Sequence, residues 1–356
     1  HDPMRVRGAL ICILDEIRGK QGHLYLDTES LINLGLKMLN EKIPIPGMRL
    51  SKKEVEEVLQ GMILSGTVVL CHDNIYLPRI FDLEDSTARL IAKRLVFASE
   101  VEHIAPLMEQ IKKEMGISLS AKQDKAVRMA FRHNLTIITG SPGTGKTTVL
   151  KTILEVYRRR HTDGKIMLMA PTGRASRRMA ESTGFEEAKT LHSGLGLGSE
   201  EDENGRKKED SLLTADLIIV DEFSMVDMWL AKQLFQRLKD DCRIVLVGDA
   251  DQLPSVGAGN VFHELIECGL IPVTMLDEIF RQAKDSLIAH NAKFINEGST
   301  NLYYGPDFVF YTCNNQNEAA EKIMECYCNE IAESGIERVQ ILSPFRAEGA
   351  ASAEQL

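Results

Sequence analysis

Apolar residues recur at helical spacing in three segments near the start of the chain. Residues 4–17 and residues 31–39 each place leucine and isoleucine side chains on one helical face, and Ser30 is a residue type that caps the second of these helices. Ser51 and Glu54 have the spacing of a capping box, which marks the start of a third helix. The pattern therefore predicts three short amphipathic helices in succession.

Two short apolar runs follow these helices, at residues 68–70 and 75–77, and the polar residues between them predict the turn of a hairpin. Helices followed by a hairpin are similar to a winged helix, so we expect a small winged-helix-like α+β module over residues 1–83. Its role stays open between DNA contact and a structural or protein-docking task. The second alternative is favoured, because the helix after Ser51 carries no stripe of basic residues.

The pattern changes at residue 119, where short and wholly apolar runs begin to alternate with helical segments. Residues 84–118 keep helical spacing and are expected to form a helical linker. Runs without polar alternation are typical of strands buried on both faces. They occur at Leu135–Ile138, Ile166–Met169, Leu217–Val220, Ile244–Val247 and Val339–Leu342. These runs predict the α/β class, with a parallel sheet covered by helices, in a first domain over residues 119–280 and the start of a second over residues 281–356.

One segment, residues 193–214, interrupts the alternation. It contains Gly194, Gly196 and Gly198, then an acidic run, an Asn-Gly pair and a basic triplet. Asn-Gly is typical of the tight turn of a hairpin. Two alternatives stay open for this insertion, a protruding two-stranded pin and a disordered charged loop.

Composition narrows the class of protein. With 356 residues, 44% apolar and 26% charged, the chain has the size of about two soluble globular domains. Its net charge of −10 argues against wrapping nucleic acid by overall charge, although a local basic groove stays compatible with it. No apolar run approaches the ~18 residues of a membrane helix. Seven scattered cysteines without C-x-x-C spacing predict reduced thiols, a cytoplasmic protein and no cysteine-based metal site.

The clearest chemical motif is Gly-Ser-Pro-Gly-Thr-Gly-Lys-Thr at residues 140–147, which lies between an apolar run and a helix. Backbone N–H groups of such a loop surround phosphates, Lys146 reaches the β- and γ-oxygens, and Thr147 can ligate Mg²⁺. We therefore predict an ATP-binding loop that consists of Gly140, Gly143, Thr144, Gly145, Lys146, Thr147 and Thr148.

Asp221 and Glu222 end the apolar run 217–220. We predict that Asp221 holds Mg²⁺ and that Glu222 polarises the attacking water. Two acids at the end of a run can also cap a helix. Together with the phosphate-binding loop, however, they indicate nucleotide hydrolysis.

Two glutamines carry weaker signals. Gln252 follows the apolar run 244–247, where it could sense the γ-phosphate or be an ordinary loop residue. Ser120 and Gln123 have capping-box spacing just ahead of the run that precedes the phosphate loop. Gln123 could also read adenine there, and the two roles are compatible.

Two further turns follow the apolar runs. Thr172 and Gly173 could expose N–H groups to a phosphate at a helix start, or simply cap that helix. Thr190 and His192 offer a hydroxyl and an imidazole of the same kind, although a lone histidine is more often structural.

Together these segments resemble the DNA helicases of the RecD/TraA type in superfamily one, relatives of the exodeoxyribonuclease V alpha subunit. The matching stretches occur in family order at Leu119–Val127, Gly140–Thr148, Ala170–Ala175 with Thr190–His192, Val220–Asp227, Val247–Val256, Glu278–Gln282 and Leu342–Arg346. Residues 1–80 resemble, more weakly, the region before the motor in the stand-alone RecD-like subgroup.

The resemblance implies an ATP-dependent helicase that moves 5′-to-3′ on single-stranded DNA, with two RecA-like motor domains and Mg²⁺, in recombination and repair. It implies that Gln123 contacts adenine and that Gln252 and Arg281 face the γ-phosphate, where Arg281 would otherwise be a surface arginine. It places along the DNA strand Thr172, Gly173, Arg174, Thr190 and His192.

The same resemblance assigns residues 193–214 to the pin that splits the duplex. It implies single-stranded DNA, 5′-tailed duplex DNA and recombination or repair proteins as partners, without a membrane. The family's later motifs are missing before Leu356, so we expect a fragment of a longer helicase that is weakly active or inactive by itself. The rival hypothesis is a P-loop switch or clamp that does not translocate but controls a partner protein, and DNA-stimulated ATP hydrolysis separates the two.

Overall fold

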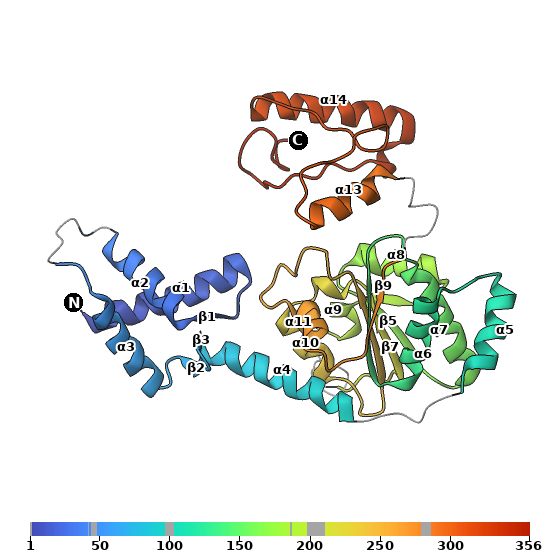
Figure 1. Ribbon diagram of the computed structural model, residues 1–356, viewed down its shortest axis with the longest axis horizontal. Helices are drawn as coiled ribbons and strands as arrows, with labels where there is room; N and C mark the ends of the chain where they lie inside the picture. Colours follow the sequence, from blue (N-terminus) through green and yellow to red (C-terminus); the bar gives the residue numbers. More distant parts are fainter. Residues whose placement is uncertain are drawn as a thin grey trace. The chain divides into compact units, whose positions relative to one another are not determined.

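The computed structural model describes residues 2–41, 43, 48–96, 103–185, 187–197, 211–278 and 286–356. The chain divides into two compact units, His1–Ala283 and Lys284–Leu356. Within the first unit, a small N-terminal module precedes a larger α/β domain (Figure 1). In the described part of the chain, no helix has the length and apolar character needed to cross a membrane.

The N-terminal module has the element order of a winged helix, as the sequence predicts. Its elements are α1 (Pro3–Gln21), β1 (Tyr25–Asp27), α2 (Thr28–Asn40), α3 (Lys52–Leu64), β2 (Val69–Cys71) and β3 (Asn74–Tyr76). The strands form an antiparallel sheet in the order β1-β3-β2. Strand β1 is an addition to the prediction, because three partly exposed residues at a sheet edge leave no apolar pattern.

Of the two helix caps predicted for this module, the structure confirms one and contradicts the other. The capping box of Ser51 and Glu54 opens α3 as predicted. The prediction that Ser30 caps the second helix is wrong, because α2 begins earlier and the carboxylate of Asp27 accepts the N–H of Ser30 at 2.8 Å. Aspartate caps a helix as well as serine does, and the extended backbone of Asp27 suits that position.

The larger domain is built on a six-stranded sheet in which every pair is parallel, in the order β6-β5-β7-β8-β4-β9. Its strands are β4 (Leu135–Gly140), β5 (Ile166–Ala170), β6 (Ala188–Thr190), β7 (Leu217–Val220), β8 (Arg243–Gly248) and β9 (Val273–Leu276). The fold is therefore the predicted α/β, RecA-like arrangement. The two strands without a sequence signal, β6 and β9, are edge strands with exposed positions.

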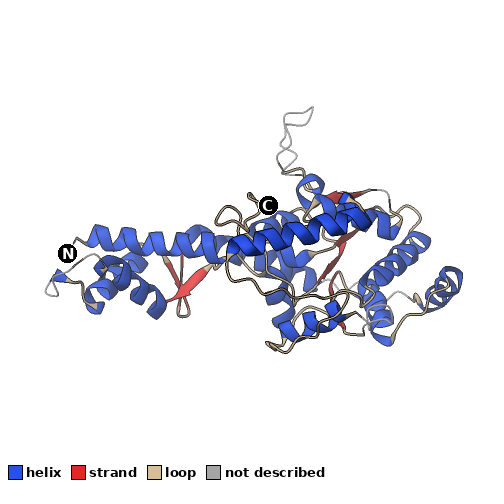
Figure 2. Ribbon diagram, turned by 90° about the horizontal axis from the view of Figure 1, so that it is seen from above, coloured by secondary structure: helices blue, strands red, loops and turns tan. Residues whose placement is uncertain are grey.

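Helices cover both faces of this sheet (Figures 1 and 2). They are α4 (Pro78–Val96), α5 (Ala105–Met115), α6 (Ala121–Arg132), α7 (Lys146–Arg160), α8 (Gly173–Thr183), α9 (Leu191–Gly194), α10 (Met228–Gln236) and α11 (Val261–Glu267), with a 3₁₀ turn at Phe223–Met225. One core lies under α4, α9, α10 and α11, and the other under α5 to α8.

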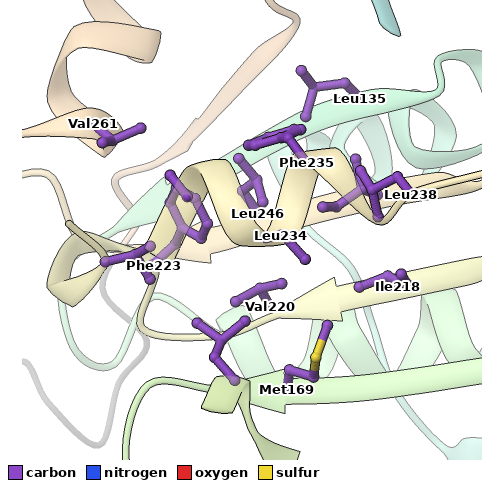
Figure 3. Packing of buried hydrophobic residues seen from close by; sticks show 14 of the residues in the cluster. Leu135, Met169, Ile218, Val220, Phe223, Leu234, Phe235, Leu238, Leu246 and Val261 are labelled. Carbon is purple, nitrogen blue, oxygen red and sulfur yellow. The ribbon is translucent and has the colours of Figure 1, made fainter. Parts of the chain in front are cut away.

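The alternation of side chains in β7 explains how one strand serves both cores. Ile218 and Val220 point to the face covered by α10, where Figure 3 shows them below Leu234. Leu217 and Ile219 point to the opposite core. All four side chains are buried, which is why the sequence of this strand is apolar without interruption.

The segment expected to be a linker, residues 84–118, consists of the end of α4 and of α5, with residues 97–102 outside the described part. Helix α4 packs on α10, and the buried guanidinium of Arg94 donates to the carbonyls of Leu238, at 2.6 Å, and Lys239. The N-terminal module touches the α/β domain where the N–H of Gly259 donates to the carbonyl of Gly22 at 2.9 Å.

The second unit contains α13 (Leu287–Asn296), α14 (Gln316–Ser334) and a 3₁₀ turn at Ile336–Arg338. The predicted strand at residues 339–342 is wrong. Within residues 286–356 the only strand-like pairing is an isolated bridge between Gly305 and Phe308. A strand needs a neighbouring strand for its hydrogen bonds, and Leu342 is 82% exposed.

Candidate functional site

Three adjacent strands of the α/β domain end at one edge of the sheet. Strands β7, β8 and β4 are neighbours and run parallel, so their carboxyl ends lie side by side. The first carries Asp221 and Glu222, the second carries Asp249, and the third leads into the loop 140–147. This edge is where open α/β sheets bind ligands.

The loop after β4 has a backbone that only glycine permits at two positions. A Cβ on Gly140 would lie 2.5 Å from the carbonyl oxygen of Leu276 in the neighbouring strand β9. Gly145 has a φ of +82° and caps the start of α7. The N-terminus of α7 therefore faces the inside of the loop, as the motif predicts.

Some residues of the loop stabilise its shape, and others are exposed at its surface. Thr144 is buried, and its hydroxyl donates to the carbonyl of Ser141 at 2.8 Å, so this side chain closes the loop. Gly143 and Thr147 are exposed at the loop and the start of α7. The carbonyl of Thr148 accepts the hydroxyl of Thr152 within α7.

Gln123 joins α6 to the loop. It is 1% exposed, its side-chain oxygen accepts the N–H of Ser120 at 3.0 Å, and its Nε2 donates to the carbonyl of Thr144 at 3.1 Å. The predicted capping box is present. Contact of Gln123 with adenine stays a prediction. The side-chain amide has a second proton, which could be donated to the base.

Lys146 lies inside the loop, where its Nζ donates to the carbonyls of Gly140 and of Ser141, the second at 3.3 Å. Burial lowers the pKa of Lys146, while the nearby carboxylates of Asp249, Glu222 and Asp221 oppose this effect. The sequence motif therefore brings the ammonium group and the carboxylates of two other strands together.

Asp221 and Glu222 form a half-buried acidic pair. The Oδ1 of Asp221 accepts the N–H of Glu222 at 2.9 Å. Burial raises the pKa of Asp221, and burial followed by repulsion from Asp221 raises the pKa of Glu222. Lys146 and Arg178 oppose both shifts. A site of this kind favours a cation or the uptake of a proton.

Glu222 also adopts a strained backbone. Its φ of +53° and ψ of +39° lie in the left-handed region, which a residue with a Cβ enters at a cost of about 1–2 kcal/mol. Such conformations gather at functional sites, where the surrounding structure enforces them. Here the strain turns the side chain at the point where β7 ends.

The donor set fits a magnesium ion. Asp221 keeps one carboxylate oxygen beyond the bond to Glu222, and Thr147 adds an exposed hydroxyl at the start of α7. Hard oxygen ligands from one carboxylate and one hydroxyl are typical of Mg²⁺ that also binds phosphates. A bound cation would also offset the negative charge of the half-buried acidic pair.

Asp249 belongs to this site although sequence reasoning gave it no role. It is 3% exposed, its Oδ1 accepts the N–H of Asp251 at 3.1 Å, and its Oδ2 accepts the Nε2 of Gln252 at 3.4 Å. The signal was an acid directly after an apolar strand, the same signal that identified Asp221. Gln252 is exposed beside it, and Arg281 lies outside the described residues.

The adjacent part of the sheet edge carries the residues predicted to contact DNA. Thr172 caps α8 by accepting the N–H of Ala175 at 3.2 Å, and Thr190 caps α9 by accepting the N–H of Ser193 at 3.1 Å. Both threonines are thus helix caps. A cap uses an acceptor lone pair, so each hydroxyl proton can still be donated to a ligand.

Gly173 and Arg174 occupy the first turn of α8. A Cβ on Gly173 would have no atom within 4 Å, and its φ is not positive, so neither packing nor backbone requires glycine there. Arg174 is exposed. The open space over this helix start allows another backbone to approach closely.

His192 is exposed rather than part of a core, and its ring centroid lies 6.5 Å from that of Trp229. Sequence reasoning gave Trp229 no role, and the available signal was that it is the only tryptophan of the chain. The predicted pin falls mostly on residues 198–210, outside the described part, so its two alternatives stay open.

Comparisons with known proteins bear on this arrangement. A family model described as an AAA domain matches residues 123–258. The chain is 33% identical over 224 residues to the "ATP-dependent RecD2 DNA helicase" of Deinococcus radiodurans, covering 63% of this chain and 30% of that protein. It is 38% identical over 167 residues to the "RecBCD enzyme subunit RecD" of Haemophilus influenzae, covering 41% and 26%.

The chain is similar to RecD-type helicases of superfamily one, and we call it RecD-like for that reason. The RecD-like chain spans less than half the length of these curated relatives. Among solved structures, it is similar to the Pif1 helicase of Candida albicans, at 25% identity, with a TM-score of 0.40 and coverage of 59% of this chain and 55% of that one.

Proposed function

We propose that this chain carries the ATP-driven motor of a DNA helicase that moves 5′-to-3′ along single-stranded DNA. One observation carries the proposal: the same edge of the sheet holds a candidate nucleotide site and, beside it, a candidate site for the phosphates of DNA. The ends of β4, β7 and β8 gather a phosphate-binding loop and three carboxylates, and the ends of β5 and β6 lead into capped helix N-termini. Similarity to a protein named as an ATP-dependent DNA helicase supports DNA as the polymer.

The nucleotide half would bind ATP and hydrolyse it. Lys146 binds the β- and γ-phosphates, and Asp221 with the hydroxyl of Thr147 would hold Mg²⁺, which neutralises phosphate charge when bound. Glu222 accepts a proton from the attacking water, and its raised pKa makes it a better proton acceptor than an ordinary glutamate. Gln252, tethered to Asp249, would contact the γ-phosphate.

The DNA half would bind phosphates with neutral donors. The hydroxyls of Thr172 and Thr190 and the first-turn N–H groups of α8 and α9 can donate to phosphate oxygens. Binding through dipoles and a few cations such as Arg174 is compatible with a net charge of −10.

Translocation would need two motor domains that close on ATP and reopen after hydrolysis. We assign residues 119–280 to the first and residues 281–356 to the beginning of the second, with Arg281 near the γ-phosphate. Residues 193–214 are proposed as the pin, and recombination or repair proteins as partners.

The test measures ATP hydrolysis with and without a single-stranded oligonucleotide, and unwinding of 5′-tailed and 3′-tailed duplexes. It uses the longest natural polypeptide that contains these residues. We expect DNA-stimulated hydrolysis and unwinding of the 5′-tailed duplex only. Lys146→Ala should abolish nucleotide binding, and Lys151→Ala, farther along the same helix, should leave it unchanged. Hydrolysis that ignores DNA would instead indicate a switch that does not translocate.

A further inference from the structure

Trp229 and His192 form an aromatic pair on the surface of the α/β domain. Trp229 lies in the first turn of α10, which follows β7, and His192 lies in α9, which follows β6. Their ring centroids are 6.5 Å apart and their planes differ by 35°. The pair thus bridges two helices that start at the same edge of the sheet, on either side of β5.

The indole is not part of the core. Trp229 is 46% exposed, although the residues around it in α10 are buried. Those buried neighbours are Met228, Leu230, Ala231, Leu234 and Phe235. Core packing therefore uses the other sides of the helix and leaves the indole outside. A large aromatic ring held at the surface is a common contact group for a ligand.

The surroundings of the pair favour a single strand of nucleic acid as its ligand. Thr190, two residues before His192, accepts the N–H of Ser193, and its own hydroxyl proton can be donated to a phosphate. Lys189 precedes it in an exposed position, and Lys232 lies three residues after Trp229, on the same side of α10. Cations and helix dipoles suit phosphates, and a flat ring suits a base of any sequence.

A protein partner fits this place less well. Protein-binding patches gather apolar side chains in a contiguous core. Here the exposed residues that flank His192 in the chain are polar, namely Lys189 and Ser193. One ring surrounded by donors and cations matches a base and its phosphates better than an apolar interface.

We infer that Trp229, supported by His192, stacks on an unpaired base of single-stranded DNA and so positions the strand next to Thr190 and the N-terminus of α8. The inference rests on the proposed function and adds a residue to it. Trp229 lies in α10 and not in the phosphate-binding loop 140–147, so we expect it to hold DNA and not nucleotide.

The first measurement uses the indole itself, since it is the only tryptophan. The full chain is titrated with oligothymidylate while intrinsic fluorescence and the anisotropy of a labelled oligonucleotide are recorded in parallel. We expect saturable quenching with the same midpoint as the anisotropy curve. Blunt duplex DNA should give no such quenching, because its bases are already stacked.

Substitutions then test the energetic role. Trp229→Ala should weaken oligothymidylate binding roughly 5- to 150-fold, the range measured for loss of one base–aromatic stack. Trp229→Phe should keep most of the affinity because it keeps a ring. The matched control is Leu270→Ala, since Leu270 is 73% exposed and precedes β9, at the opposite edge of the sheet. ATP affinity should be the same in all variants.

An oligonucleotide with abasic sites separates stacking from a structural effect. Wild type and Trp229→Ala should bind it equally, because no base remains to stack. If the substitution distorted the surface instead, Trp229→Ala would bind both oligothymidylate and the abasic oligonucleotide more weakly than the wild type. If the wild type binds oligothymidylate without quenching and Trp229→Ala binds it equally well, the inference is overturned and the proposed function stands. If the wild type binds no single-stranded DNA, the proposed function itself fails.

Discussion

The Nε2 of Gln123 donates a hydrogen bond to the backbone carbonyl of Thr144, 3.1 Å away, and so ties α6 to the phosphate-binding loop. Gln123 is 1% exposed, and its other amide atom accepts the N–H of Ser120. The residue therefore supports the shape of the loop from behind, whatever it contacts on a nucleotide.

We expect Gln123→Ala to weaken binding of both ATP and tripolyphosphate by roughly 5- to 30-fold. The reason is that a buried carbonyl and a buried N–H lose their partners, at about 1–2 kcal/mol. Titration calorimetry with both ligands checks this. Gln110→Ala is the control, because Gln110 is exposed and bonds only within α5. A larger loss for ATP than for tripolyphosphate would add an adenine contact, and an unchanged tripolyphosphate affinity would refute the tether.

The sequence predicts those parts of the fold and the site that leave a local pattern of residues, and it misses contacts between distant segments. Apolar runs located the four central strands, and acids or glycines directly after them located the nucleotide edge. The edge strands β6 and β9 escaped, because strands with exposed positions lose the apolar run. The tether from Gln123 to Thr144 and the approach of Trp229 to His192 escaped too, since they join segments far apart in the chain.

Glu222→Gln should keep ATP and Mg²⁺ binding but lower the hydrolysis rate about 10²-fold or more, the scale of lost general-base catalysis. The amide matches the carboxylate in shape and cannot accept the proton of the attacking water. Single-turnover hydrolysis is measured in the longest natural polypeptide that contains the site, with Glu264→Gln as a control on α11. A normal rate in Glu222→Gln would show that another group is the base.

The pH dependence of hydrolysis should follow the same carboxylate. Burial raises the pKa of Glu222 above the ordinary value of 4.5. Below its pKa the group is protonated and cannot act as a base, so activity should fall on acidification at a pH higher than an ordinary glutamate would give. The residual rate of Glu222→Gln should lack this acidic limb. A wild-type limb centred at or below 4.5 would contradict the assignment.

The left-handed backbone of Glu222 predicts that glycine is more stable than alanine at this position, the reverse of the usual order. Glycine has no Cβ penalty at a φ of +53°, so Glu222→Gly should be more stable than Glu222→Ala by about 1 kcal/mol. At Gln236, an exposed position in the last turn of α10, the order should reverse, with alanine more stable than glycine. Urea unfolding of the four variants measures both differences. The same order at both positions would mean that Glu222 is not strained.

Gly173 offers a test of the proposed DNA-binding edge that leaves folding intact. An added Cβ meets no atom within 4 Å, and the φ of Gly173 is not positive. Gly173→Ala should therefore keep or raise the thermal stability, by up to about 1 kcal/mol, because alanine restricts the unfolded chain. The methyl group would nevertheless occupy the space over the first turn of α8, where a DNA phosphate is proposed to bind.

We expect the affinity of Gly173→Ala for oligothymidylate, measured by fluorescence anisotropy, to fall severalfold, with ATP affinity unchanged. Gly61→Ala, which also meets nothing within 4 Å but lies in α3, is the matched control and should leave DNA affinity unchanged. Equal DNA affinity for Gly173→Ala and the wild type would move the strand away from this helix start.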